Sequence, residues 1–193
     1  MSNSSEVVPS GRPRSAEADQ AIYEACIQLL SEEGFPSTTI DAVANLSGVS
    51  RPSIYRRFAD RNDLIESCVE KLLSTDLPTV TPTSNPMRDV VALLENTCHM
   101  LTQTLMGGII RCVMPYLTKH QRVAEHFVSV GNRRRVALRQ ALLRAIEDGM
   151  IDEPTNVDVL IDALIGAIYT RFLMTNHLNR SYARKLVKEL TNW

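Results

Sequence analysis

The chain has 193 residues and a formal net charge of −1, with 44% apolar and 22% charged residues. This length can bury a full core in one large domain or two small ones, and the composition is ordinary for a soluble globular protein. No apolar run approaches the roughly 18 residues of a membrane span, and the first ten residues lack the pattern of a secretory signal, so we expect a cytoplasmic protein without a membrane partner.

The four cysteines, Cys26, Cys68, Cys98 and Cys112, are scattered along the chain, and no two of them form a CxxC pair. This spacing argues against a zinc site or a disulfide framework and favours a reducing cytoplasm. The histidines show no metal-ligand spacing beside acids or cysteines. We therefore expect no metal site and no cofactor.

Residues 1–15 are polar, contain proline and lack periodicity, which predicts a flexible basic arm. Ser15 is a candidate N-cap for a first helix, whose apolar residues recur at helical spacing as far as Leu30. Gly34 predicts the end of this helix, because glycine readily adopts the left-handed conformation that follows a helix.

Two short helices follow. Thr38 with Asp41 three residues later resembles a capping box that opens the first of them. The triplet Ser47-Gly48-Val49 breaks this helix, and Ser50 is the N-cap of the next. That second helix carries a proline in its first turn, where the missing N–H costs nothing, and we expect it to run to about Phe58.

The rest of the chain also reads as helices. A further helix is expected to start at Asp60, and residues 74–86, with three prolines, predict a linker loop. Apolar periodicity then predicts helices over residues 87–106, 111–119, 121–148, 157–175 and 181–192, separated by Gly107-Gly108, Gly149 and Pro154. The predicted fold is all-α, with an N-terminal three-helix unit within residues 16–73 and a C-terminal helical bundle over 87–193.

The two short helices over residues 38–58, joined by a glycine-centred turn, are typical of a helix-turn-helix. Ile54 and Phe58 lie four residues apart and are expected to face the core, which leaves hydrogen-bond donors on the outer face. Arginine can fork onto guanine, and hydroxyl groups suit bases and phosphate oxygens. We therefore expect this outer face to bind double-stranded DNA in the major groove, through Arg51, Pro52, Ser53, Tyr55, Arg56 and Arg57.

Here the sequence resembles a known family. The runs Thr39-Ile40-Asp41-Ala42-Val43-Ala44, Ser47-Gly48-Val49-Ser50, Ser53-Ile54-Tyr55-Arg56-Arg57-Phe58 and Arg61-Asn62-Asp63-Leu64-Ile65 are similar, in order and spacing, to the N-terminal signature of the TetR/AcrR transcriptional regulators. The resemblance covers about residues 16–72. It implies a sequence-specific DNA-binding regulator, usually a repressor that a small molecule releases from its operator.

The resemblance also implies roles for single residues. Thr39 would contact a backbone phosphate, and Arg61, where the family usually has lysine, would clamp another. Ser50, Arg51, Ser53, Tyr55 and Arg56 would face DNA from the recognition helix, and Arg51 and Pro52 fall at variable positions that bear on which operator is read. Arg12 and Arg14 resemble a basic arm that reaches the minor groove, although a plain flexible tail explains them equally well.

The last two predicted helices carry apolar stripes. The run from Val157 to Phe172 is similar to one subgroup of TetR C-terminal domains, and its stripe would pair with a second copy into a four-helix dimer interface. An intramolecular core explains the same stripes, but a homodimer is favoured because two half-sites multiply the specificity of one short helix. The expected interface residues are Leu160, Ile161, Leu164, Ile165, Ile168, Leu186 and Leu190.

A ligand pocket is expected among the helices of residues 87–148, closed by the helix over 157–175. Methionine and aromatic side chains suit a small apolar or aromatic ligand, although each also suits a plain core. The expected lining residues are Cys98, Leu101, Leu105, Met106, Met114, Tyr116, Phe127, Tyr169 and Phe172. The run Arg133-Arg134-Arg135 is interpreted as a solvated helix face.

The expected mechanism is a population shift between two dimer shapes, one of which spaces the recognition helices about 34–36 Å apart to fit successive major grooves. Two alternatives stay open. One is a DNA-binding regulator without a small-molecule ligand, controlled by a protein partner. The other is a helical small-molecule-binding protein or enzyme, but no nucleophile–base pair, metal set or phosphate loop is visible, so we expect no enzyme.

Overall fold

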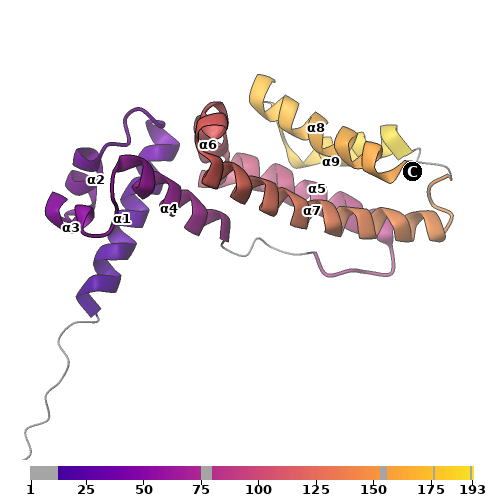
Figure 1. Ribbon diagram of the computed structural model, residues 1–193. Coiled ribbons are helices and arrows are strands. Elements are labelled where there is room, and N and C mark those ends of the chain that lie inside the picture. Colours follow the sequence, from indigo (N-terminus) through magenta and orange to yellow (C-terminus); the bar gives the residue numbers. More distant parts are fainter. Residues whose placement is uncertain (1–12, 75–79, 153–155, 176, 192) are drawn as a thin grey trace, which may run out of the picture.

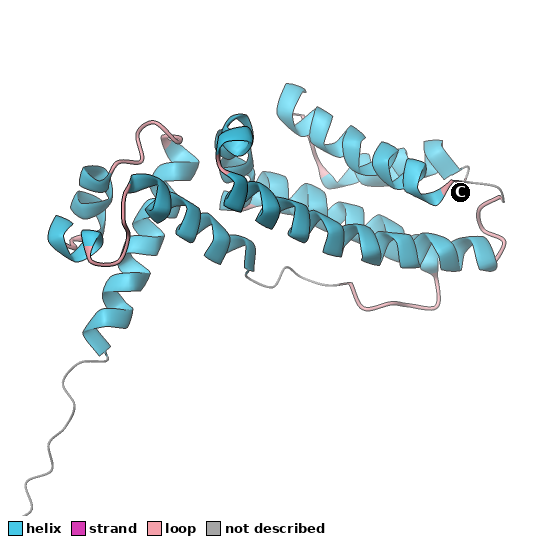
Figure 2. Cartoon of the chain, viewed as in Figure 1, coloured by secondary structure: helices cyan, strands magenta, loops and turns pink. Residues whose placement is uncertain are grey.

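The computed structural model describes residues 13–74, 80–152, 156–175, 177–191 and 193, and every regular element in this part is a helix (Figures 1 and 2). The predicted all-α class is therefore confirmed. The elements are α1 (Pro13–Glu32), α2 (Ile40–Ser47), α3 (Arg51–Tyr55), α4 (Arg61–Ser74), α5 (Pro86–Gln103), α6 (Leu105–Val113), the 3-10 helix η1 (Met114–Lys119), α7 (Gln121–Glu147), α8 (Val157–Thr175) and α9 (Arg180–Thr191).

The helices form two groups along the molecule. Figure 1 shows α1 to α4 clustered at one end, and α5, α7, α8 and α9 bundled lengthwise at the other. None of the described helices is long and apolar enough to cross a lipid bilayer. The helix α4 reaches Ser74 and α5 begins at Pro86, so the connection between the groups closely matches the expected linker.

The helix α1 begins earlier than expected. It starts at Pro13 rather than after Ser15, so the last three residues of the expected flexible arm are helical, and residues 1–12 lie outside the described residues. A proline in the first turn needs no hydrogen-bond partner, which permits the earlier start. The helix ends as expected at Gly34, which has a φ of 83°.

Capping fixes the helix-turn-helix, with one correction. The N-cap of α2 is Thr39, whose Oγ1 accepts a hydrogen bond from Ala42 N at 3.1 Å. Thr38, the expected cap, is buried instead and donates to Gly34 O at 3.0 Å, because a buried hydroxyl needs a partner. Gly48 closes α2 with a φ of 69°.

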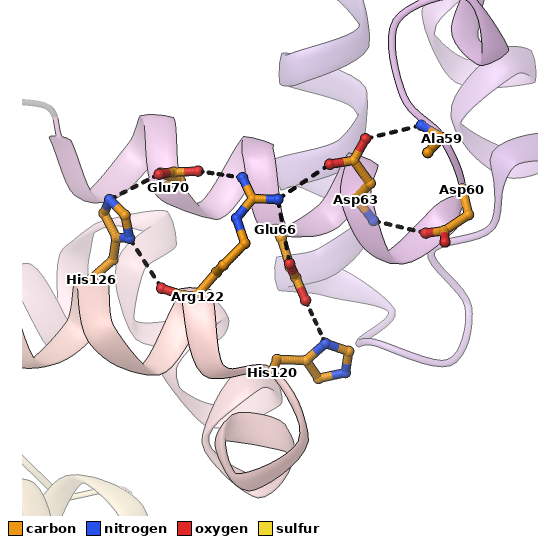
Figure 3. Close-up of polar contacts among 8 residues, drawn as sticks. All are labelled: Ala59, Asp60, Asp63, Glu66, Glu70, His120, Arg122 and His126. Atoms are coloured by element: carbon orange, nitrogen blue, oxygen red, sulfur yellow. Dashed lines mark hydrogen bonds and ion pairs between the residues drawn. The ribbon is translucent and has the colours of Figure 1, made fainter.

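The helix α3 has five residues, so it ends before the expected Phe58. The start of α4 is as expected, with a reciprocal pair of caps that Figure 3 shows. Asp63 N donates to Asp60 Oδ1 at 2.9 Å, while Ala59 N donates to Asp63 Oδ2 at 2.9 Å. Two backbone N–H groups that the helix cannot satisfy are thereby paired.

The helix-turn-helix rests on a dense apolar core. Ile22, Val43, Ile54 and Leu64, one from each of the first four helices, are fully buried. Such burial stabilises by about 1.5–3 kcal/mol per side chain, and for a helix as short as α3 it outweighs intrinsic helix propensity. The position of α3 therefore depends on Ile54.

Gly107 and Gly108 do not separate two helices, as the sequence predicted, but lie in the first turn of α6. The break falls at Thr104, whose Oγ1 donates to Met100 O at 2.7 Å and accepts from Met106 N at 3.2 Å. The glycines allow close approach instead. A Cβ at Gly107 would lie 1.9 Å from Leu101 O, and one at Gly108 would lie 2.8 Å from Ser31 O.

The second contact joins the N-terminal group to the C-terminal half of the chain, since Ser31 belongs to α1 and Gly108 to α6, which packs against α5. An aromatic stack continues this contact, because the Phe35 and Tyr116 ring centroids lie 4.4 Å apart. We call these four residues the α1–α6 junction. It is a close contact between the N-terminal helices and the C-terminal half of the chain.

A polar contact joins the groups a second time. We call it the α4–α7 ion cluster, and it consists of Asp63, Glu66 and Glu70 from α4 with His120, Arg122 and His126 from the start of α7 (Figure 3). The Arg122 guanidinium lies 2.9 Å from Glu70, 3.3 Å from Asp63 and 3.6 Å from Glu66. Hydrogen bonds to Glu70 and Asp63 raise the pKa of Arg122.

Two histidines complete this cluster. His120 Nδ1 lies 2.7 Å from Glu66 Oε1, and His126 Nε2 lies 3.0 Å from Glu70 Oε1. All three cluster carboxylates lie on one face of α4, at positions three and four residues apart, so α7 contacts about two turns of that helix. A displacement of α7 would therefore strain or break these ion pairs, or would move α4 with it.

The α1–α6 junction yields a stability prediction. Replacing Gly108 with Ala should lower the free energy of unfolding by about 1–3 kcal/mol, because the new methyl group meets the backbone of Ser31 and α1 must shift. Gly131→Ala in α7 is the matched control, since a Cβ there meets no described atom within 4 Å. The control should stabilise by about 0.5–1 kcal/mol through helix propensity. Urea unfolding measures both, and equal effects would contradict the close approach.

The α4–α7 ion cluster yields a salt-dependent prediction. Arg122→Met leaves three neighbouring carboxylates on α4 without the guanidinium between them. It should lower the melting temperature by the equivalent of about 1 kcal/mol or less of unfolding free energy, because Arg122 is half-exposed. The loss should shrink between 0.1 and 1 M NaCl, where the screening length falls from about 10 to about 3 Å. Arg139→Met, which removes a single exposed pair with Asp158, should cost less. A loss that salt leaves unchanged would refute an ionic role for Arg122.

Candidate nucleic-acid interface

The outer face of α3 carries the side chains that the sequence assigned to DNA. Ile54 is fully buried, while Arg51, Pro52 and Arg56 are exposed and Tyr55 is 56% exposed. This division follows from the helix itself, because a residue anchored in the core turns its neighbours at one and two positions away toward solvent. Four of the six residues expected on the outer face are thus exposed, while Ser53 and Arg57 are half-buried, and contact of this face with DNA stays a prediction.

A short polar chain orders this face. Ser50 Oγ donates to Ser53 Oγ at 3.2 Å, and Arg56 Nη2 donates to the same Ser53 oxygen at 2.7 Å. Ser50 has the backbone conformation of an N-cap, but its side chain makes no capping hydrogen bond. The two serines therefore help to hold the Arg56 guanidinium along the surface of α3.

Two further exposed groups flank α3. Arg51 Nε lies 2.7 Å from Asp41 Oδ1 across the turn, in an ion pair that is exposed on both sides and therefore weak. Such a pair can be exchanged for a phosphate or a base at little cost. Thr39 is exposed at the start of α2, and since its oxygen accepts from Ala42 N, its own proton is left to donate outward.

Arg57 and Arg61 differ from what the sequence predicted. Arg57 Nε pairs with Asp19 of α1, and its Nη1 donates to Ser53 O at 2.8 Å. Arg61 Nε donates to Thr38 O at 2.7 Å, its Nη2 donates to Phe35 O, and its guanidinium lies over the Phe35 ring. Both side chains are bonded to other parts of the helix-turn-helix in the free protein, so a contact of either one with DNA stays a prediction.

The reason for this correction is the length of α3. Because the helix ends at Tyr55, Arg57 follows its C-cap and no longer continues the outer face of α3, and Arg61 begins the next helix, α4. No signal in the sequence separates a bracing arginine from a reading one. Arg14 lies in the first turn of α1, and Arg12 lies outside the described residues, so a minor-groove role for them stays a prediction.

The expected ligand residues do not share one environment. Cys98, Leu101, Met106 and Phe172 are buried, and Phe127 and Tyr169 are half-buried. Leu105 and Met114 are 51% and 42% exposed, and Tyr116 stacks on Phe35. Burial raises the pKa of the Cys98 thiol to about 11, which makes it a poor nucleophile near neutral pH.

Two grooves that the structure contains lie elsewhere. One, of about 570 Å³, runs between α5 and α9 and is lined by Arg88, Val91, Glu95, Arg184 and Lys188 among others. The other, of about 500 Å³, lies between α5 and α7. Neither is lined by any of the nine residues that the sequence assigned to a pocket. The sequence missed both, because each groove is formed by side chains from helices far apart in the chain.

The expected dimer face is also corrected. Leu160, Ile161, Leu164 and Ile168 are buried within the single chain, where α8 packs against α5 and α7. Ile165 and Leu186 are half-buried, and Leu190 is exposed. The outward face of α8 instead presents Val159, Ala163, Gly166, Thr170, Leu173 and Met174, all exposed. This stripe of small and apolar residues is left without a partner in the described part of the chain.

Similarity to known proteins agrees with this architecture. Residues 22–68 match the family model for bacterial regulatory proteins of the TetR family, and residues 80–190 match that for the Tetracyclin repressor-like C-terminal domain. The chain is 30% identical over 179 residues to the HTH-type transcriptional regulator YdeS of Bacillus subtilis, covering 92% of this chain and 89% of that one. It is 23% identical to the DNA-binding transcriptional repressor TetR of Mycobacteroides abscessus, covering 95% of each.

A solved structure shows the same fold. The transcriptional regulator FadR from Bacillus subtilis, in complex with stearoyl-CoA, superposes with a TM-score of 0.67 at 13% identity, covering 89% of this chain and 97% of that one. The two family models together span the helix-turn-helix and the bundle, and the relatives are matched over nearly their whole length. The chain therefore belongs to the TetR family of bacterial transcriptional regulators.

Proposed function

We propose that this regulator is a homodimeric repressor that binds a double-stranded DNA operator through α3 and leaves it when a small molecule binds the C-terminal bundle. The observation that carries the proposal is the face of α3, where Arg51, Tyr55 and Arg56 are exposed opposite the buried Ile54. The M. abscessus relative is a DNA-binding repressor by name, which supports the direction of control.

The proposed division of work follows from donor chemistry. Arg51 and Arg56 have planar guanidinium groups that match the two acceptors of guanine, so they are proposed to read bases. Tyr55 and Thr39 carry single hydroxyl donors, which suit phosphate oxygens and fix the register of the helix on the duplex. Ser53 positions Arg56 at 2.7 Å and is proposed to act through it.

Dimerisation is proposed to use the outward face of α8. Gly166, Ala163 and Thr170 lie three or four residues apart on this face and let a second copy of the helix approach closely. Two copies paired there, with α9 alongside, would form a four-helix interface. The two α3 helices would then read half-sites about 34–36 Å apart.

We propose that the ligand releases DNA by a movement of the bundle, which both contacts between the helix groups transmit to the N-terminal helices. A ligand that prefers one arrangement of the bundle shifts the dimer toward that arrangement by its difference in affinity. The α4–α7 ion cluster and the α1–α6 junction would pass the movement to α1 and α4, which carry α3. The FadR structure of the same fold is a complex with stearoyl-CoA, which supports control of this regulator by a ligand.

The DNA-binding proposal is tested by selecting bound sequences from a random pool of duplexes and then measuring affinity. Arg56→Ala should weaken operator binding by about 1–3 kcal/mol and relax specificity at one base pair. Arg88→Ala removes an exposed cation at the start of α5 and should leave binding unchanged. No sequence enrichment by the wild-type protein at low salt would overturn the proposal.

The dimer proposal is tested with two matched glycine-to-arginine variants. Gly166→Arg should convert the protein to a folded monomer, because the new side chain fits the free chain, where a Cβ meets no described atom within 4 Å, but not a paired face. Gly131→Arg makes the same change on α7, also without a neighbour within 4 Å, and should remain dimeric. Analytical ultracentrifugation distinguishes the states, and a dimeric Gly166→Arg protein would assign the interface to another surface.

A further inference from the structure

The arginine run at residues 133–135 is not one solvated face, as the sequence suggested. Consecutive residues of a helix point about 100° apart, so three in a row cannot share a face. Arg133 is exposed, and Arg135 Nη1 lies 2.6 Å from Asp162 Oδ1 of α8. Arg134 instead turns into the bundle, where its Nη2 lies 2.8 Å from the Met100 sulfur of α5.

The surroundings of Arg134 do not balance its charge. Among the described residues no carboxylate pairs with it, and a thioether is a weak acceptor for a guanidinium. Burial lowers the pKa of Arg134, although an arginine stays charged in any protein environment. Arg134 is half-buried, so the bundle partly shields a positive charge from water without pairing it with a carboxylate among the described residues, an arrangement that costs desolvation energy.

The neighbouring phenol is not that counter-ion. Tyr169 of α8 lies close enough to Arg134 to interact electrostatically, and burial raises the pKa of Tyr169, so its hydroxyl is neutral near pH 7. A neutral hydroxyl can donate a hydrogen bond to an anion. Arg134 and Tyr169 thus form a pair of donors from two helices, beside the adaptable side chain of Met100.

We propose that Arg134 is the anchor of the effector site, and that the effector is a compact organic anion, a carboxylate on an apolar body. The inference rests on the proposed repressor function and names its ligand class. The guanidinium fork matches a carboxylate with two parallel hydrogen bonds, which would replace the contact with Met100. Met100 is unbranched and flexible, so it can yield to an apolar group. The apolar ligand expected from the sequence thereby gains a required negative charge.

The position of Arg134 also connects the site to DNA binding. It lies on α7, the helix that carries Arg122 and His126 of the α4–α7 ion cluster. Arg134 follows Arg122 by twelve residues, a distance of about 18 Å along a helix. An anion that draws Arg134 toward α8 and away from Met100 would therefore move a helix that already contacts α4.

The test compares an anion with its uncharged analogue on the full chain. The probes are 2-naphthoate and 2-naphthylmethanol, which share an aromatic body and differ in the carboxylate. Naphthoate at about one hundred times its Kd should raise the melting temperature of the wild-type protein by about 5–10 °C, and the alcohol should raise it far less. Arg134→Met should abolish the preference for the anion, while Arg133→Met, an equal loss of charge one residue away, should keep it.

A second measurement needs no ligand. Without a probe, Arg134→Met should melt a few degrees above the wild-type protein because a charge without a carboxylate partner leaves a half-buried position, and Arg134→Gln should retain at least wild-type stability. Equal binding of the two probes by the wild-type protein, or naphthoate binding that survives Arg134→Met, would overturn the inference. So would a clear loss of stability in both Arg134 variants, which would mean that the guanidinium is already satisfied.

Operator binding by the same variants separates this inference from the function on which it rests. Arg134→Met should bind selected DNA as the wild-type protein does, and naphthoate should no longer weaken that binding. A wild-type protein that selects no DNA sequence would refute the repressor function. A wild-type protein that binds DNA but shows no preference for the anion would refute the anion site alone.

Discussion

A helix of five residues is too short to persist in water, and α3 has that length. Its shape and direction must therefore come from its neighbours. The apolar anchor is Ile54, which is fully buried in the apolar core. Polar contacts add to this support. Arg57 forms an ion pair with Asp19 of α1, and Arg61 donates hydrogen bonds to the carbonyl oxygens of Phe35 and Thr38. The exposed face of α3 can present charged groups because so many contacts behind it are fixed.

This support divides four neighbouring arginines into two kinds. Arg51 and Arg56 have exposed guanidinium groups held only by weak surface contacts, so a duplex can engage them without disturbing the fold. Arg57 and Arg61 instead bond to Asp19 and to backbone carbonyl oxygens within the fold. The positive charge available to DNA is thus smaller than the sequence suggests, which makes a second copy of α3 in a dimer more important for affinity.

The bundle shows the same separation between packing and function. The apolar stripe of α8 that the sequence marked as an interface is largely used inside the chain, while the outward stripe is built from smaller residues around Gly166. Small residues cover less apolar area, so they stand out less in a hydrophobic pattern, yet they permit close contact between helices. Gly108 has the same property at the α1–α6 junction, where it lets α6 approach the backbone of Ser31.

The sequence by itself determined the helical class, most helix bounds, and the family, because helix periodicity, caps such as Asp60 with Asp63, and the helix-turn-helix runs are local features. It also indicated which side of α3 is buried, since Ile54 and its neighbours sit on one short helix. Only the tertiary structure decided which arginines are exposed and which are bonded within the fold, which face of α8 is free, and that Arg134 turns toward α5. Each of these depends on contacts between residues distant in the chain, such as Arg61 with Phe35 and Arg134 with Met100, and a one-dimensional pattern carries no information about such partners.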